Sequence, residues 1–154
     1  MKKKPIIWMD LEMTGLYPDK DQIIEVAIII TNSEFEVMCT PKHIIIHVDE
    51  DTLNNMDAWN KKQHAKTGLW QKVLKSKVSL EAAEKEVFSY IKSNAPKNCY
   101  LAGNSIWQDR RFIRRYMKTV DEYLSYRMID VTSVKLLCDY WYPDLYFNKK
   151  QGHR

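Results

Sequence analysis

The chain has 154 residues, of which 45% are hydrophobic and 29% are charged, and its formal net charge is +4. This composition predicts a single globular domain over residues 1–154 with a sizeable core, and it excludes a disordered or fibrous chain. The mild positive charge permits a polyanionic partner without requiring one, because scattered lysines often form only a solvated face.

Strand signals dominate the start of the chain, and weaker helical patterns follow them. A continuous apolar run at 6–9 is typical of a strand buried on both faces. The other elements expected in this half are strands at 23–30, 37–39 and 44–48 and helices at 54–63 and 68–74. The strand spacing indicates that several of these strands pair antiparallel.

The second half alternates helices with short strands. Ser79, which acidic residues follow, predicts a helix start, and Pro96 ends that helix. The remaining expected elements are a strand at 100–102, a helix from about Gln108, a strand at 128–129 and a helix capped by Asp130. Strands first, then alternating helices and strands, indicate an α/β fold with a mixed sheet.

The three cysteines, Cys39, Cys99 and Cys138, have no Cys-x-x-Cys spacing and are odd in number. Neither a disulfide framework nor a zinc site is therefore expected. Reduced thiols indicate an intracellular protein, and we expect a cytoplasmic location, with mitochondria or nucleus as alternatives. No apolar run reaches the roughly 18 residues that span a bilayer, so no membrane partner is expected.

Two carboxylates follow the first predicted strand. Side chains on a strand repeat every second residue, so Asp10 and Glu12 should project from the same face. Two neighbouring carboxylates repel each other unless a cation lies between them, and such hard ligands suit Mg²⁺ or Mn²⁺. Gly15 would let a backbone approach a ligand closely. The alternative is a strand end with two solvated acids, because this spacing is common by chance.

Asp109 and His153 are further candidates. Asn104 and Ser105 are expected to cap the helix that Asp109 enters, where free N–H groups would favour a phosphate. A histidine with a pKa of about 6.5 can accept a proton from water near neutral pH. Taken alone, an acid in a first helical turn and a histidine in a basic loop are more often ordinary surface residues.

Three segments carry a family resemblance: 10–16, 102–112 and 129–135. In this order they resemble the oligoribonucleases, which are 3′-to-5′ exoribonucleases of the DEDDh superfamily. The resemblance implies a ribonuclease-H-like α/β fold in which helices flank a mixed β-sheet. It also implies hydrolysis of very short RNA, with dinucleotides best, to mononucleotides.

The resemblance implies a role for each candidate residue. Asp10, Glu12 and Asp109 would bind two divalent ions, Mg²⁺ or Mn²⁺, and His153 would be the general base. The implied substrate-binding residues are Thr14, Gly15, Leu16, Trp59, His64, Ser105, Tyr126 and Arg127. The resemblance further implies a homodimer in which Tyr126 and Arg127 reach across the interface to the 5′ phosphate of the substrate.

The family pattern also requires an Asp on a final helix shortly beyond His153, whereas the sequence ends at Arg154. A longer natural chain is the favoured interpretation, because every upstream motif is intact. A form that truly lacks this Asp should bind catalytic metal weakly and be nearly inactive. Robust release of mononucleotides in the presence of Mn²⁺ by the 154-residue chain would contradict that expectation.

Two other functions remain open. A DEDDh exonuclease acting on longer RNA or DNA ends would need an open basic track, which the mild charge disfavours. A catalytically silent nucleotide-binding or dimerisation module would keep the same motifs. Two residues also need an explanation: Trp107 either narrows the site or packs outward, and Glu25 is expected to be a hydrogen-bonded structural carboxylate.

Overall fold

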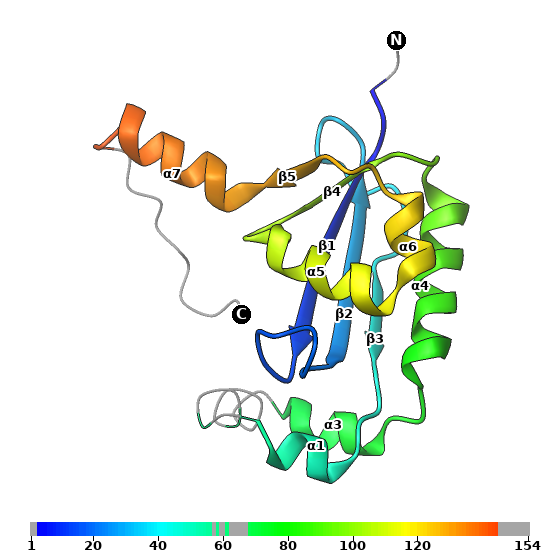
Figure 1. Cartoon of the computed structure of the whole chain (residues 1–154). Helices are drawn as coiled ribbons and strands as arrows, with labels where there is room; N and C mark the ends of the chain where they lie inside the picture. Colours follow the sequence, from blue (N-terminus) through cyan, green and yellow to red (C-terminus); the bar gives the residue numbers. More distant parts are fainter. Residues whose placement is uncertain (1–2, 57, 59–60, 62–67, 145–154) are drawn as a thin grey trace.

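The centre of the fold is a five-stranded sheet, seen in a computed structural model that describes residues 3–56, 58, 61 and 68–144 (Figure 1). The strands are β1 (Ile6–Met13), β2 (Ile23–Thr31), β3 (Lys42–Ile45), β4 (Tyr100–Gly103) and β5 (Met128–Asp130). Their order across the sheet is β3-β2-β1-β4-β5. β1, β2 and β3 pair antiparallel, whereas β4 and β5 run parallel to β1 and β4 respectively. The predicted mixed α/β sheet is therefore confirmed.

The strand predicted at 37–39 is wrong. Val37 forms only an isolated bridge to Thr31. The side-chain Oδ1 of Asn32 accepts hydrogen bonds from the N–H groups of Glu34 and Glu36, and Phe35 adopts a left-handed φ of 64°. This turn ends just before Val37, so the segment meets β2 only at the Thr31 bridge and through the N–H of Met38, which donates to the carbonyl of Ile30.

Six helices lie in the described part of the chain. They are α1 (Glu50–Asn54), α3 (Leu69–Lys75), α4 (Leu80–Asn94), α5 (Ile106–Tyr116), α6 (Lys118–Tyr123) and α7 (Val131–Trp141). The predicted caps at Ser79 and Asp130 are confirmed, because their side chains accept hydrogen bonds from Ala82 and Thr132. Asp49 starts α1 earlier than expected by capping Thr52. Much of the helix predicted at 54–63 lies outside the described residues.

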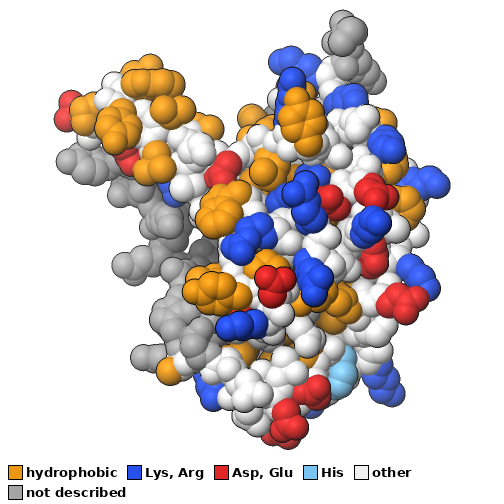
Figure 2. All heavy atoms as spheres, viewed as in Figure 1, with side chains coloured by type: hydrophobic (Ala, Val, Ile, Leu, Met, Phe, Trp, Pro, Cys, Tyr) orange, Lys and Arg blue, Asp and Glu red, His pale blue; other side chains and the backbone are white. Residues whose placement is uncertain are grey.

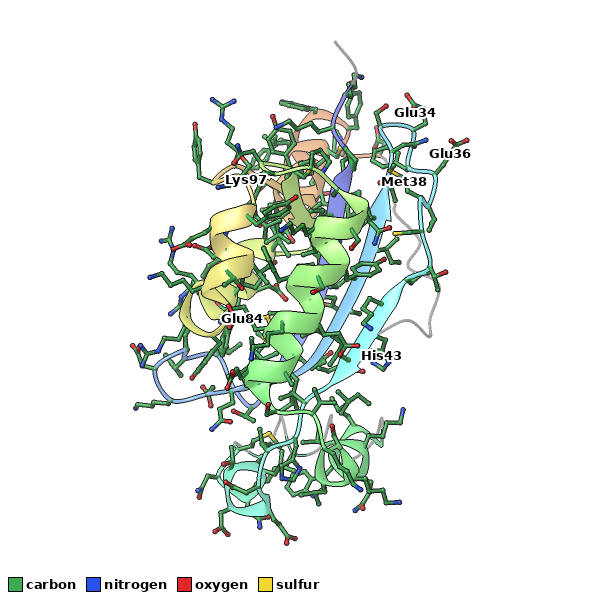
Figure 3. All side chains as sticks on the ribbon, turned by 90° about the vertical axis from the view of Figure 1, so that its right-hand side faces the viewer. Glu34, Glu36, Met38, His43, Glu84 and Lys97 are labelled. Atoms are coloured by element: carbon green, nitrogen blue, oxygen red, sulfur yellow. The ribbon has the colours of Figure 1, made fainter. Side chains whose placement is uncertain are left out.

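Helices α4, α5 and α6 cover one face of the sheet (Figures 1 and 3). The core between them includes Ile7 and Leu11 of β1, Val87 of α4 and Phe112 of α5. Glu84 of α4, labelled in Figure 3, accepts hydrogen bonds from the backbone and side chain of Thr119 and so joins α4 to α6. This packing fixes the position of α5 against β1.

Two parts extend from this core. α1 and α3 lie at one end of the sheet (Figure 1), over a small cluster of buried residues: Ile24, Val48, Leu53, Met56, Leu69 and Val73. α7 projects away from the sheet, and none of its residues is buried. Among the described residues, no helix has both the length and the apolar character needed to cross a bilayer.

Candidate active site

Strand β1 presents two carboxylates. Asp10 and Glu12 alternate with the buried residues Met9 and Leu11, so both project from the sheet face opposite the core. Asp10 is exposed, and Glu12 is half-buried. The register against β2 shifts between Glu12 and Met13, so the regular pairing of β1 ends directly after the second carboxylate.

Asp109 reaches β1 from helix α5. β4 pairs with Ile6, Ile7 and Trp8 of β1. Beyond this pairing, the N–H of Leu11 donates a hydrogen bond to Asp109 Oδ1 at 2.9 Å. Asp109 is only 7% exposed. The side chain of Asp109 thus lies beside β1, the strand that carries the other two acids.

The three acids form one electrostatic cluster. Burial, helped by the charges of Asp10 and Glu12, raises the pKa of Asp109 to about 7, although the hydrogen bond from Leu11 lowers it. Burial and the charge of Glu25 raise the pKa of Asp10. Each ionised carboxylate therefore makes ionisation of its neighbours less favourable, and a bound cation would remove this penalty.

The chemistry of this donor set fits a hard divalent cation such as Mg²⁺ or Mn²⁺, which prefers carboxylate oxygens. In the positions that the described side chains occupy, no group of three or more His, Cys, Asp or Glu residues is arranged to hold a metal ion. Binding a shared ion would therefore require a change in the side-chain positions of these acids.

Glu25 lies opposite Glu12 across the β1–β2 pair. Its carboxylate Oε1 forms a hydrogen bond with Nε2 of His43, a residue of β3 that Figure 3 labels. The prediction that Glu25 is a hydrogen-bonded carboxylate is therefore confirmed. Its charge still contributes to the site, because it raises the pKa of Asp10.

A hollow of about 610 Å³ lies where the chain leaves β1, and we call it the Leu16 hollow. Its lining residues are Thr14, Gly15, Leu16, Tyr17, Lys20, Asp21, Gln22, Thr52, Asn55 and Met56. Three predicted substrate-binding residues, Thr14, Gly15 and Leu16, thus share one cavity. Leu16 is 62% exposed, so its apolar side chain is available to contact a ligand.

Asp21 forms hydrogen bonds within the loop that connects β1 to β2. Its Oδ1 accepts from the hydroxyl of Thr14 at 3.2 Å, and its Oδ2 accepts from the N–H of Tyr17 at 2.9 Å. A Cβ on Gly15 would lie 2.5 Å from either carboxylate oxygen of Asp21. Sequence reasoning missed Asp21, because a hydrogen bond within an irregular loop leaves no periodic signal.

We expect Gly15→Ala to destabilise the fold by about 1–3 kcal/mol, because the added methyl group would enter space that Asp21 fills. Urea unfolding measures the change. Asp21→Ala is the matched background, since it removes the obstructing carboxylate. The cost of Gly15→Ala should shrink in that background, and an equal cost in both backgrounds would contradict this explanation.

Ser105 occupies the N-cap position of α5, as expected, but its side chain does not cap the helix. Ser105 adopts a left-handed φ of 51° and makes no side-chain capping hydrogen bond. Its N–H instead donates to Asp130 Oδ1 at 3.1 Å and to Thr132 Oγ1 at 2.9 Å. Asn104 accepts a hydrogen bond from Thr132 as well. The junction between β5 and α7 thus holds the segment that was expected to cap α5.

Tyr126 and Arg127 lie in a different cavity. The guanidinium of Arg127 is 5.4 Å from the centre of the Tyr126 ring, and both residues are exposed. They line a hollow of about 360 Å³ with Lys4, Asn98, Tyr100 and Ser125. This cavity, which we call the Arg127 hollow, shares no lining residue with the Leu16 hollow. Trp59, His64 and His153 lie outside the described residues.

Comparison with known proteins identifies the family of this chain. A family model described as Exonuclease matches residues 7–154. An oligoribonuclease of Francisella tularensis subsp. novicida is 47% identical over 150 residues, which are 97% of this chain and 84% of the relative. An oligoribonuclease of Pseudomonas syringae is 45% identical over 152 residues, which are 98% of this chain and 85% of the relative.

Solved structures show the same fold. E. coli Exonuclease I in complex with a dT13 oligonucleotide matches 97% of this chain with a TM-score of 0.72 at 19% identity. This chain spans about a third of that longer protein, 32% of its length. The ribonuclease-H-like fold implied by the three motifs is thereby confirmed. Because relatives at 45–47% identity match 97–98% of this chain, the chain belongs to the oligoribonuclease family of exonucleases.

Proposed function

We propose that this chain hydrolyses very short RNA from the 3′ end and releases mononucleotides, with dinucleotides as its best substrates. The observation that carries the proposal is the hydrogen bond from Leu11 to Asp109, which brings an acid of α5 to the strand of Asp10 and Glu12. The Leu16 hollow opens where the same strand ends. Family membership supplies the reaction class.

Asp10, Glu12 and Asp109 are proposed to hold two divalent cations, Mg²⁺ or Mn²⁺. Such cations, when bound, lower the pKa of an attacking water and clamp the scissile phosphate in line. Asp109 suits this role because its burial disfavours the ionised form and a nearby cation would restore it. His153 is proposed to accept the proton of the attacking water.

The Leu16 hollow is proposed to receive the bases of the substrate. Leu16 and Trp59 would hold a base between them, with His64 nearby, and stacking on an aromatic side chain is worth about 1–3 kcal/mol per base. The backbone at Thr14 and Gly15 would approach the nucleotide closely. Asp21 supports this role, because it holds the loop in one conformation.

Two observations support a homodimer. The Arg127 hollow is separate from the Leu16 hollow, so Tyr126 and Arg127 would need a partner subunit to bring them to a bound 5′ phosphate. Helix α7 also exposes many apolar side chains (Figure 2), which are typical of an interface. The exposed apolar residues are Val134, Leu136, Leu137, Tyr140 and Trp141, between 44% and 84% exposed.

Mixing two inactive variants tests whether Arg127 acts across the dimer. Asp109→Asn removes a proposed metal ligand, and Arg127→Ala removes the proposed phosphate contact. A mixed dimer would contain one site with both residues intact, so an equal mixture should recover about a quarter of wild-type activity. No recovery after subunit exchange, verified by mass spectrometry, would place Arg127 and Asp109 of one chain in the same site.

A length series tests the substrate class. Radiolabelled RNAs of increasing length, each with a 2′-deoxy counterpart, should show the fastest hydrolysis for the ribodinucleotide, and the deoxy series should be slower, because the 2′-OH distinguishes RNA. Faster digestion of long chains would instead favour an exonuclease acting on longer ends. Binding of dinucleotides without hydrolysis, at saturating Mn²⁺, would favour the silent nucleotide-binding module.

A further inference from the structure

Two consecutive residues of α5 form hydrogen bonds with the two ends of the segment 11–16. Asp109 accepts a hydrogen bond from the N–H of Leu11, and Gln108 Nε2 donates one to the carbonyl of Leu16 at 2.8 Å. Between these two points lie Glu12 and Gly15. The first turn of α5 therefore sets the spacing between the acids of β1 and the apolar side chain of the Leu16 hollow.

The carboxamide of Gln108 has a fixed orientation. Its Oε1 accepts a hydrogen bond from Arg111 Nη1 at 2.9 Å. Because Arg111 can only donate, Oε1 must face it, and the NH₂ group must face the carbonyl of Leu16. Arg111 therefore determines which way the Gln108 carboxamide is turned, so that its NH₂ group bonds to Leu16.

Arg111 is itself supported by an aromatic ring. Its guanidinium carbon lies 5.9 Å from the centre of the Trp107 ring, a cation–π distance. Trp107 is 53% exposed, so the indole packs outward and does not fill the site. Figure 2 shows several Lys and Arg side chains over α5 and α6. The hydrogen bond from Arg111 to Gln108 holds this guanidinium near the first turn of α5.

We propose that Gln108, oriented by Arg111, is a positioning residue that fixes the substrate-contacting Leu16 relative to Asp109. The proposal rests on the proposed function, because it assigns Leu16 to the substrate. A reacting phosphate must lie at a defined place relative to its catalytic groups, and small displacements reduce the rate or the affinity strongly. A hydrogen bond from the residue adjacent to Asp109 provides that constraint directly.

The far end of the loop has its own supports. The hydroxyl of Tyr116 donates to the carbonyls of Pro18 and Asp21 at 2.8 and 2.7 Å, and the carboxylate of Asp21 holds Tyr17. Loss of the Gln108 contact should therefore leave the fold and the part of the loop beyond Tyr17 intact. Its effect should concentrate on Leu16, and thus on substrate affinity.

Gln108→Ala should raise the KM for a ribodinucleotide about fivefold, as expected for one neutral hydrogen bond, with kcat changed less than about twofold. Hydrolysis of bis(p-nitrophenyl) phosphate, which has no base, should not change. Gln71→Ala makes the same chemical change at an exposed site on α3 and should affect neither substrate. Equal losses on both substrates would show a general defect and overturn the proposal, as would an unchanged KM.

A double-variant cycle tests the role of Arg111. Arg111→Ala should raise the dinucleotide KM about two- to threefold, because it frees the carboxamide that holds Leu16. Combined with Gln108→Ala, it should add nothing further, since Arg111 acts through Gln108. Additive effects would overturn this part of the proposal. Trp107→Phe keeps an aromatic face for the guanidinium and should retain most of the affinity, whereas Trp107→Ala should resemble Arg111→Ala.

Hydrogen exchange separates this proposal from the proposed function. In the protein without substrate, Gln108→Ala should accelerate exchange of the Tyr17 amide, which belongs to the same peptide unit as the Leu16 carbonyl, and leave the Leu11 amide unchanged. If wild-type protein failed to hydrolyse dinucleotides but showed this response, the proposed function would fail while the contact between Gln108 and the loop stood. If dinucleotides were hydrolysed and Gln108→Ala altered neither exchange nor KM, the positioning role alone would fail.

Discussion

Asp109→Asn should stabilise the metal-free protein at pH 8 by about 4 kcal/mol, because the pKa of Asp109 rises from 3.8 to about 7 on folding. At pH 8 the folded wild-type chain must keep a buried carboxylate ionised beside Asp10 and Glu12. Asparagine carries no charge, and its Oδ1 can still accept the hydrogen bond from Leu11. A candidate metal ligand thus lowers the stability of the fold that carries it.

The pH dependence of this effect has a defined sign. Below about pH 4 the carboxyl group is protonated in both the folded and the unfolded chain, so wild type and variant should be equally stable. The wild type should lose stability relative to the variant as the pH rises from about 4 to 7, and the difference should be constant above that range. Urea unfolding in EDTA at several pH values measures this difference in the free energy of unfolding.

Asp144→Asn is the control for this series, because it makes the same substitution at an exposed position. It should leave the pH profile of stability unchanged. A difference between Asp109→Asn and wild type that did not vary with pH would contradict the assignment of the raised pKa to Asp109. Asp109→Asn should also be inactive as a nuclease, so this substitution raises the stability of the metal-free fold and abolishes activity.

Local sequence signals predicted the elements that depend on local interactions. The apolar run at 23–30 became β2, and the Ser79 and Asp130 caps formed as expected. Each of these features is determined by residues close together in the chain, so its signal lies in a short window. The family motifs likewise predicted that Asp109 would be a neighbour of β1.

Features that depend on distant contacts could not be predicted in this way. The hydrogen bond from Gln108 to Leu16 joins a helical residue to an irregular loop that lies 92 positions away in the chain, so no local pattern indicates it. Ser105 lies at the N-cap of α5, but its hydroxyl pairs with Thr132 Oγ1, far along the chain, and does not cap the helix. The apolar pattern of 131–141 predicted a helix correctly but could not indicate that its side chains stay exposed in the single chain.

Asp10→Asn should weaken divalent-metal binding and reduce nuclease activity by more than about 100-fold, since loss of an outer-shell partner alone typically costs 10- to 100-fold. The wild-type protein at a Mn²⁺ concentration of 100 times its Kd should gain about 2.7 kcal/mol of stability. A variant that binds 100-fold more weakly should gain only about 0.4 kcal/mol at that concentration. Thermal unfolding at increasing Mn²⁺ concentrations measures both.

The charge of Asp10 gives this experiment a second, independent result. Asp10 raises the pKa of Asp109, so Asp10→Asn should also make the metal-free fold slightly more stable at pH 8. Weaker stabilisation by Mn²⁺ together with a more stable metal-free fold would identify Asp10 as both a ligand and a repulsive neighbour. Glu122→Gln, at an exposed site on α6, should change neither quantity. Unaltered Mn²⁺ stabilisation in Asp10→Asn would remove this residue from the metal site, because a direct ligand cannot be lost without a change in affinity.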